Sequence, residues 1–255
     1  MILLISQFNS KQHIFKLIKS INITSCRLVV VNHSEDNLYL PGVDFININK
    51  SVSLSKSRNI ALDYCVEKGY FKECNYIMFP DDDAAFSEDF WENIDFRLNQ
   101  TSLFNVEDNG KIMFKWWHYG YLSYKNVMSS NIVINIKDFK NFRFDENLGI
   151  GSKFGSGEDL DLFWSIGDGK FNLLKDIFIH HTLVSSNYRD INDQSRLNKY
   201  FLGHLKVCQK HNRILPVVFS LFIPIARIIL FKSFNHNFKI FKNRLKSILK
   251  FNRKI

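Results

Sequence analysis

Three consecutive aspartates, Asp81, Asp82 and Asp83, directly follow an apolar run that ends at Phe79 and Pro80. Adjacent carboxylates repel one another. A hard divalent cation bound to a phosphate oxygen is a common reason for a protein to hold several carboxylates at the end of a strand. The alternative is a solvated acidic turn that caps the next helix. The three aspartates alone therefore indicate either a metal–phosphate site or a cap.

A second group of carboxylates follows a glycine-rich loop. The loop spans residues 149–157 and runs into Glu158, Asp159 and Asp161, which lie in the first turn of an expected helix. Acidic side chains in that turn favour the helix dipole by about 0.3–1 kcal/mol each, which is the purely structural interpretation. Glycines let a backbone approach a ligand closely, so the loop favours a functional interpretation.

Four short motifs occur in an order that carries a resemblance to a known family. They are Ser53-Leu-Ser55-Lys-Ser-Arg58-Asn59-Ile-Ala-Leu62, Asp81-Asp82-Asp83, Gly157-Glu158-Asp159 and His180-His181. In order and spacing they resemble the family 2 glycosyltransferases of the GT-A fold, over roughly residues 1–190. The resemblance implies transfer of a sugar from a nucleotide-diphosphate donor, such as a UDP-sugar, to an acceptor hydroxyl with inversion at the anomeric carbon.

The resemblance assigns roles to the three aspartates. It implies that Asp83 ligates a Mn²⁺ or Mg²⁺ ion that bridges the two donor phosphates, while Asp81 lies near the donor ribose or in the water shell of the metal. Such an ion neutralises charge on the leaving nucleoside diphosphate. Asp82 is a further donor-side candidate, or it points away and caps Ala84 and Ala85.

The two later motifs supply the expected base and the last metal ligand. The resemblance implies that Asp159 removes the proton of the acceptor hydroxyl, with Glu158 as the alternative; a positioned base contributes typically 10²–10⁴-fold. A histidine after the last strand completes the metal site in related enzymes, and neutral imidazole suits Mn²⁺. The spacing to the serines at 185–186 favours His181, with His180 as the alternative.

The donor side is expected to involve three further residues. Arg58 and Asn59 match the family element that lies against the donor, and the fork of Arg58 could pair with phosphate. A surface arginine on a helix is the alternative for Arg58. Ser53 stands where the family has glycine, and Asn32 stands where it has the aspartate that binds the base. We expect Asn32 to substitute as a hydrogen-bonding partner.

An aromatic cluster is the candidate acceptor site. Trp116, Trp117 and Tyr119 lie where the acceptor side of such folds is built. Aromatic faces stack on sugar rings, although most such clusters are core packing. The expected acceptor is a glycan or a lipid-linked acceptor in surface polysaccharide synthesis.

Alternating apolar runs and helical patterns must position these motifs. In the first part of the chain the expected strands cover residues 1–6, 27–31, 43–48 and 76–79, and the expected helices cover 10–20 and 55–68. This alternation predicts a parallel sheet with its ligand site at the carboxyl ends of the strands. Further along, strands are expected at 112–117, 131–136, 171–174 and 177–181, and helices at 87–98 and from 158.

Charge divides the chain near residue 193. The 255 residues have a formal net charge of +9, yet all 25 Asp and Glu lie between Glu35 and Asp193. Residues 194–255 hold 14 Lys and Arg. A uniformly basic nucleic-acid binder is therefore excluded. We expect an α/β GT-A catalytic domain over residues 1–193, with a Rossmann-like mixed sheet, followed by a helical C-terminal region over 194–255.

The C-terminal region combines an apolar run with a basic amphipathic helix. Residues 214–231 are mostly apolar, but two prolines and Arg227 interrupt them, which argues against a spanning helix. After them an apolar stripe alternates with basic residues. Its members are Phe234, Phe238, Phe241, Leu245 and Ile248. The pattern suits an anionic membrane surface better than nucleic acid. Packing on the domain or in a homodimer is the alternative.

Cysteine usage and the first residues indicate where the protein works. Four scattered cysteines without a CxxC pair indicate reduced thiols in the core. Residues 1–6 are typical of a first strand rather than of a signal peptide. We therefore expect a peripheral enzyme on the cytoplasmic face of the plasma (inner) membrane. The competing hypothesis is a non-enzymatic protein that binds an anionic surface or nucleic acid through its basic C-terminal region.

Overall fold

A computed structural model gives the fold of the chain. It describes residues 1–8, 11–22, 24–87, 90–91, 100–108, 111–112, 128–139, 142–167, 171–181, 194–213, 215, 217–218, 221–222, 224–225, 228 and 234–252. The elements of the first part of the chain are β1 (Ile2–Phe8), α1 (Lys11–Lys19), β2 (Cys26–Asn32), β3 (Val43–Asn47), α2 (Leu54–Lys68), α3 (Tyr70–Glu73), β4 (Tyr76–Met78) and β5 (Ala84–Phe86). Those of the second part are β6 (Ser102–Asp108), β7 (Lys111–Ile112), the 3₁₀ helix η3 (Ser129–Asn131), β8 (Ile132–Asn135), α5 (Ile136–Phe139), α6 (Glu158–Ile166), β9 (Asn172–His181), α7 (Gln194–Lys210) and α9 (Phe234–Asn252).

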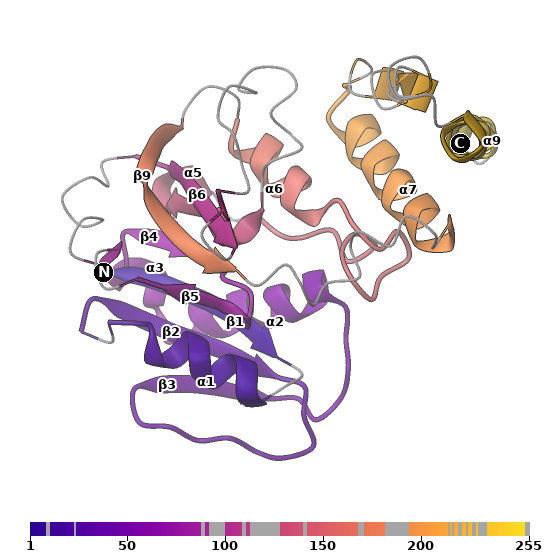
Figure 1. Ribbon diagram of the computed structural model, residues 1–255. Coiled ribbons are helices and arrows are strands. Elements are labelled where there is room, and N and C mark those ends of the chain that lie inside the picture. Colours follow the sequence, from indigo (N-terminus) through magenta and orange to yellow (C-terminus); the bar gives the residue numbers. More distant parts are fainter. Residues whose placement is uncertain are drawn as a thin grey trace.

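The strands form one mixed sheet with helices packed against it (Figure 1). The strand order is β3-β2-β1-β4-β8-β6-β9-β5, and β7 pairs with β6. Strands β3, β2, β1 and β4 are mutually parallel, which confirms the parallel sheet predicted from the first 80 residues. The apolar run of β2 is buried along almost its whole length, as expected for a parallel strand covered on both faces.

The second half of the sheet departs from the predicted elements. Strand β6 was not predicted, and the two closing strands expected at 171–174 and 177–181 form the single strand β9. The register between β6 and β9 shifts at Phe104 and Asn105, which accommodates the polar interruption between the two expected strands. Most of the helix expected at 87–98 and of the strand expected at 112–117 lies outside the described residues.

Strand β5 replaces a predicted helix cap. Ala84 and Ala85 pair antiparallel with β9, so the turn formed by the three aspartates leads into a strand. The expectation that Asp82 caps a helix at these two alanines is therefore wrong, because their backbone groups are engaged in the sheet.

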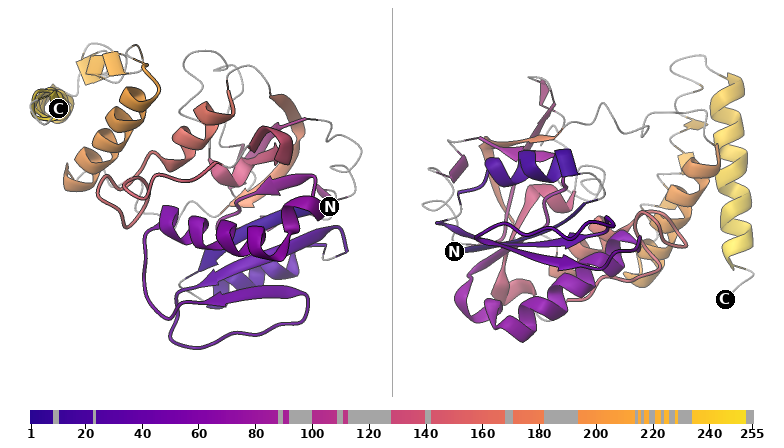
Figure 2. Two further views of the ribbon diagram at one scale, coloured as in Figure 1. Left: turned by 180° about the vertical axis from the view of Figure 1, so that it is seen from behind. Right: turned by 90° about the horizontal axis from the view of Figure 1, so that it is seen from below.

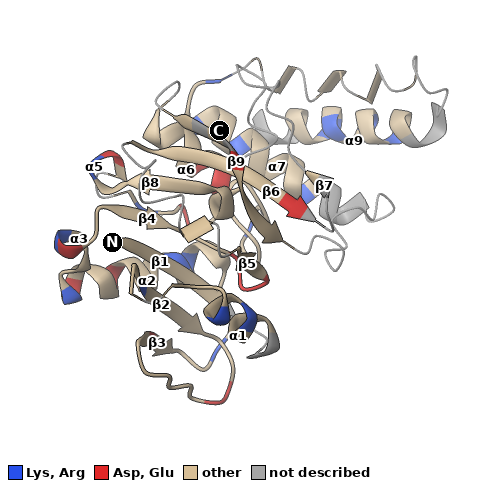
Figure 3. Cartoon of the chain, turned by 60° about the vertical axis from the view of Figure 1, so that its left-hand side comes forward, with Lys and Arg blue, Asp and Glu red and all other residues tan. Residues whose placement is uncertain are grey.

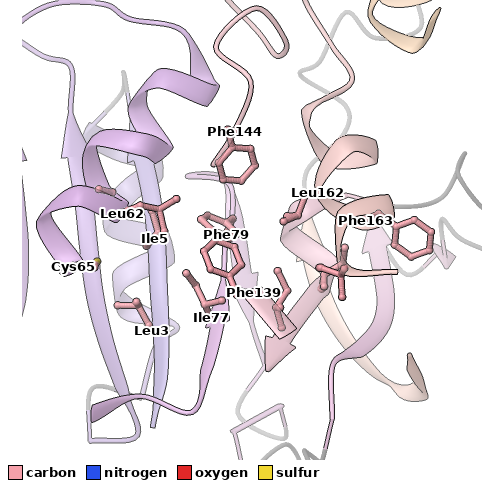
Figure 4. Packing of buried hydrophobic residues seen from close by; sticks show 14 of the residues in the cluster. Leu3, Ile5, Leu62, Cys65, Ile77, Phe79, Phe139, Phe144, Leu162 and Phe163 are labelled. Atoms are coloured by element: carbon pink, nitrogen blue, oxygen red, sulfur yellow. The ribbon is translucent and has the colours of Figure 1, made fainter. Parts of the chain in front are cut away.

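Buried side chains form a hydrophobic cluster on each face of the sheet. On one face Ile14 and Leu17 of α1 pack with Leu4 and Val30. On the other face α2 and α6 pack against the alternate side chains of the same strands. Figure 4 shows this second cluster, in which Phe79, directly after β4, lies among apolar residues from both halves of the chain. All four cysteines are free and buried, as predicted.

Helix α7 extends the second cluster beyond residue 193. Val207 and Cys208 belong to that cluster, and Phe201 and Leu205 are buried as well. The fully buried Asp161 of α6 also pairs with Lys210 Nζ at 2.7 Å and with His211 Nε2 at 2.8 Å. Helix α7 is thus built into the α/β core.

Helix α9 lies on the side of α7 that faces away from the sheet (Figure 2). Its Arg244 guanidinium stacks over the Phe201 ring of α7, 5.2 Å from the ring centroid. The helix predicted from the basic amphipathic pattern is therefore confirmed. Within the part of the chain that the structure describes, no helix has the length and apolar character needed to cross a membrane.

Candidate active site

The three aspartates follow β4 at the carboxyl edge of the parallel strands, where the sequence predicted the ligand site. The register of β5 against β9 pairs Ala84 with His181. This pairing brings His181 Nε2 to 3.1 Å from Asp81 Oδ2 and 3.2 Å from Asp83 Oδ1. Residues about 100 positions apart in the sequence therefore form one cluster.

Only one of the two adjacent histidines joins this cluster. Side chains alternate between the two faces of a strand, so His180 points away from His181. The His180 ring is about half exposed and lies 3.8 Å from Glu107 Oε2 of β6. His181 is buried beside the aspartates.

The three aspartates differ in their tendency to ionise. Burial raises the pKa of Asp81, but hydrogen bonding and charge from His181, together with the charge of Arg58, bring it below its usual value. Burial and the neighbouring Asp83 raise the pKa of Asp82 to about 6. Burial also raises the pKa of Asp83 against the opposing charge of His181. Clustered acids with divergent pKa values are typical of functional sites.

Arg58 connects this cluster to the carboxylates of α6. Its Nη1 donates to Asp159 Oδ1 at 3.2 Å, and its Nη2 donates to Ser129 Oγ at 2.6 Å and lies 3.9 Å from Asp81 Oδ1. The guanidinium also lies against the rings of Phe79 and Phe144, with 5.6 Å and 5.1 Å to their centroids.

Arg58 is only 4% exposed, so the alternative of a surface arginine is wrong. Its Nη1 and Nη2 each contact residues of the protein, which makes it a link between two groups of acids.

The amino end of α6 holds the two predicted base candidates in different surroundings. Asp159 is ion-paired with Arg58, and 29% of its side chain is exposed. Glu158 is buried beneath the glycine-rich loop. A Cβ atom on Gly149, whose φ is +93°, would lie 2.9 Å from Ser55 Oγ and 3.2 Å from Glu158 Cδ. Glycine is therefore needed at 149 both for its backbone conformation and for the close approach of the loop.

Burial raises both pKa values in this pair. Burial, followed by the charge of Asp159, raises the pKa of Glu158 to about 8. Burial raises the pKa of Asp159 too, although the charge of Arg58 opposes the shift. The more exposed Asp159 is the better placed of the two to reach a substrate, and a raised pKa suits a group that accepts a proton.

Two predicted donor-binding residues are engaged in holding loops. The Asn59 amide pairs with both backbone groups of Phe144, at 3.0 Å each, and so fixes the ring that stacks on Arg58. Asn32 Nδ2 donates to Asp36 O and Asn47 Oδ1, and Asn32 Oδ1 accepts from the backbone and side chain of Ser34.

These bonds use the full hydrogen-bonding capacity of the Asn32 side chain. A contact between Asn32 and a donor base would require some of them to break. The predicted role of Asn32 as a base partner remains a prediction.

The structure adds partners that the sequence analysis missed. Ser129 and Phe144 position Arg58, and Ser55 Oγ donates to Leu148 O at 2.7 Å below the glycine-rich loop. His33, next to Asn32, lies with Nε2 2.9 Å from Ser57 Oγ. The sequence feature that could have indicated Ser129 is the polar tripeptide 129–131, directly before a buried strand. The predicted acceptor residues Trp116, Trp117 and Tyr119 lie outside the described residues.

The cluster of Asp81, Asp83 and His181 has the donor chemistry of a divalent metal site. Among the described residues, no three His, Cys, Asp or Glu side chains are already arranged to hold an ion. Carboxylate oxygens and imidazole nitrogen are nevertheless ligands that Mn²⁺ accepts, and these three residues already meet within hydrogen-bond distance. The residues present therefore fit the predicted metal.

The mixed sheet and its flanking helices form a GT-A-like glycosyltransferase fold. The chain is similar in structure to S. aureus TarS, a glycosyltransferase, at 14% sequence identity. Against TarS 1–349 the TM-score is 0.57, with 96% of this chain and 80% of that one covered. A longer TarS structure gives 0.53, with 78% and 43% covered, so the chain spans less than half of it.

A third structure, TarS 1–349 in complex with UDP-GlcNAc, gives a TM-score of 0.53 with 79% of this chain and 65% of that one covered. No protein-family model and no curated protein matches the sequence. At this identity the likeness concerns the fold.

Proposed function

We propose that this protein is an inverting glycosyltransferase that transfers a sugar from a nucleotide-diphosphate donor, such as a UDP-sugar, to a hydroxyl of a glycan or lipid-linked acceptor. The observation that carries the proposal is the Arg58 bridge. One buried arginine joins the aspartates after β4 to the carboxylate pair that opens α6. The proposed donor-side group and the proposed base are therefore linked at one edge of a GT-A-like fold.

In this proposal Asp159 accepts the proton of the acceptor hydroxyl as its oxygen attacks the anomeric carbon. Arg58 fixes the orientation of the Asp159 carboxylate from one side and leaves the other side to the acceptor. Burial and the charge of Asp159 raise the pKa of Glu158 to about 8, which disfavours a second negative charge beside the base. Asp159 is therefore preferred over Glu158.

Asp83, Asp81 and His181 would hold a Mn²⁺ or Mg²⁺ ion, with Asp82 adjacent to it. When bound, such an ion supplies a Lewis acid that neutralises charge on the leaving nucleoside diphosphate. The close contacts of His181 with Asp81 and Asp83 hold these three side chains together.

The first test is transfer from a panel of UDP-sugars in the presence of Mn²⁺. The panel includes UDP-GlcNAc, because TarS 1–349 was solved in complex with it. Donor binding is followed separately as a rise in melting temperature, which grows with ligand concentration as RT ln(1 + [L]/Kd). The anomeric configuration of the product, read by NMR, tests inversion.

Two variants separate the proposed roles. We expect Asp159→Asn to keep the donor-induced rise in melting temperature and to lose transfer by at least about 10²-fold. We expect Asp83→Ala to lose the metal-dependent part of donor binding as well as transfer. Asp63→Asn and Asp63→Ala are the matched controls, because Asp63 is an exposed aspartate of α2. Full activity of both site variants would refute the proposed mechanism.

A further inference from the structure

Helix α9 has two different faces, and one of them is turned outward. Asn237 is almost fully buried, and Phe241 and Arg244 are half-buried, on the side that packs toward α7. Leu245 and Leu249, in contrast, are 39% and 57% exposed. The apolar stripe predicted from the sequence is therefore divided, because part of it is used for packing and part faces away.

The outward face of α9 is basic as well as apolar. Lys239, Lys242 and Lys246 are exposed, and the spacing of Lys242 and Lys246 places them around Leu245 and Leu249. Figure 3 shows basic residues on α9 and no acidic ones. The sequence contains no Asp or Glu after Asp193, so no carboxylate of this region competes for these lysines.

We propose that the outward face of α9, defined as Lys239, Lys242, Leu245, Lys246 and Leu249, docks on an anionic lipid bilayer. The helix would lie in the plane of the interface, with the leucines among the acyl chains and the lysines at the headgroups. Its 19 residues correspond to about 28 Å of helix lying along the surface.

Charge complementarity and the leucines together favour a bilayer over nucleic acid. Lysines alone would suit any polyanion, but a phosphate backbone offers nothing to cover exposed leucines. An anionic bilayer provides charge for the lysines and an apolar layer for the leucines. Leu215, Val218 and Phe222, which precede α9 in the sequence, are also 39–53% exposed.

The test is co-sedimentation of the full-length protein with vesicles. Vesicles of phosphatidylcholine mixed with phosphatidylglycerol are compared with vesicles of phosphatidylcholine alone. We expect binding to the anionic vesicles only. The double variant Leu245→Glu/Leu249→Glu should weaken it by about tenfold or more, because both apolar contacts are replaced by like charge to the lipid. No donor or acceptor is needed, so this result is independent of the proposed enzymatic function.

Matched variants test whether vesicle binding depends on this face of α9 or on apolar and basic residues anywhere on the surface. Val66→Glu/Ile112→Glu alters two exposed apolar residues outside the C-terminal region and should leave binding unchanged. Lys239→Gln/Lys242→Gln/Lys246→Gln should weaken binding and reduce its dependence on salt. Lys56→Gln/Lys68→Gln/Lys72→Gln, which removes the same charge from α2 and α3, should do neither. Unchanged circular dichroism confirms folding of each variant.

Three results would overturn the proposal. One is equal vesicle binding by the leucine variant and its control. Another is tighter binding to double-stranded DNA than to anionic vesicles at physiological salt. The third is a dimer, detected by light scattering, that the leucine variant converts to monomer while vesicles bind neither protein.

Discussion

Arg58 is contacted by residues from four separate segments of the chain. Asp81 follows β4, Ser129 lies in η3, Phe144 lies between α5 and α6, and Asp159 lies in α6. A buried cation is costly unless it is paired and hydrogen-bonded, and here Arg58 is both. The resemblance proposed Arg58 as a site residue, but a sequence motif gives no information on partners 70–100 positions away.

This arrangement predicts that Arg58 positions the base rather than the donor. Arg58→Lys keeps the charge but removes the planar fork that holds Asp159 and Ser129 at once. We expect kcat to fall by about tenfold to a hundredfold, as for a misplaced catalytic group, while donor affinity changes little. Steady-state kinetics and donor-induced thermal shifts measure the two effects. A large loss of donor affinity with kcat preserved would instead support the donor-binding role predicted from the sequence.

Glu158 predicts a pH dependence of stability. In the folded chain its pKa is about 8, well above the ordinary value of 4.5 that applies when the chain is unfolded. Between these values the folded state keeps a proton that the unfolded state has lost, so the contribution of Glu158 to stability falls as pH rises. Glutamine cannot ionise, so the stability of Glu158→Gln does not fall with pH for this reason.

We therefore expect the melting temperature of Glu158→Gln, relative to that of the wild type, to rise from about pH 5 to about pH 8. Above that pH the difference should stay constant. Calorimetry at several pH values measures the difference. Glu67→Gln, an exposed position on α2, is the control and should show a constant difference. A constant difference for Glu158→Gln as well would contradict the raised pKa.

At the scale of elements, local pattern predicted the parallel half of the sheet and not the rest. Strands β1 to β4 are apolar runs bounded by polar residues, and α2 begins at the cap Ser53 and ends at Gly69 in the left-handed region. Strand β6 was missed because Ser102 and Asn105 interrupt its apolar pattern although both are buried. Strand β5 is only three residues long, and its pairing with β9 is not encoded locally.

The close contact between α7 and the turn before α6 predicts that replacing a glycine of α7 by alanine lowers stability. Gly203 lies in α7, where alanine would ordinarily be about 1 kcal/mol better. A Cβ atom at this position would lie 2.4 Å from the carbonyl oxygen of Ser156, beside the turn that opens α6. We expect Gly203→Ala to lower the free energy of unfolding by about 1–3 kcal/mol, as overpacking does.

Urea denaturation measures this free energy. Gln209→Ala, at an exposed position of the same helix, should change it little. If Gly203→Ala proved as stable as the wild type, the tight α6–α7 contact would not exist in solution.

At the scale of the whole molecule, the charge boundary near residue 193 does not mark the limit of the hydrophobic core. Acidic residues end at Asp193, and composition therefore predicted a domain that ends there. Helix α7 is basic, yet it contributes Val207 and Cys208 to the core, and Lys210 at its end pairs with the buried Asp161, which His211 also contacts. Net charge records which residues face water, so it could not reveal that one side of α7 completes the core.

The final prediction concerns where the chain can be shortened. A chain of residues 1–213 retains α7, and we expect it to unfold cooperatively. A chain of residues 1–193 loses the apolar residues of α7 and leaves Asp161 buried without its partners Lys210 and His211. Breaking a buried pair in this way costs about 3–5 kcal/mol, a large fraction of the stability of a typical domain. We therefore expect the shorter chain to aggregate or to lack a cooperative transition by circular dichroism and calorimetry. A 1–193 chain that melts like 1–213 would restore the boundary predicted from charge.

If 1–213 folds, it should retain donor binding and lose vesicle binding, because it keeps the candidate site and lacks α9.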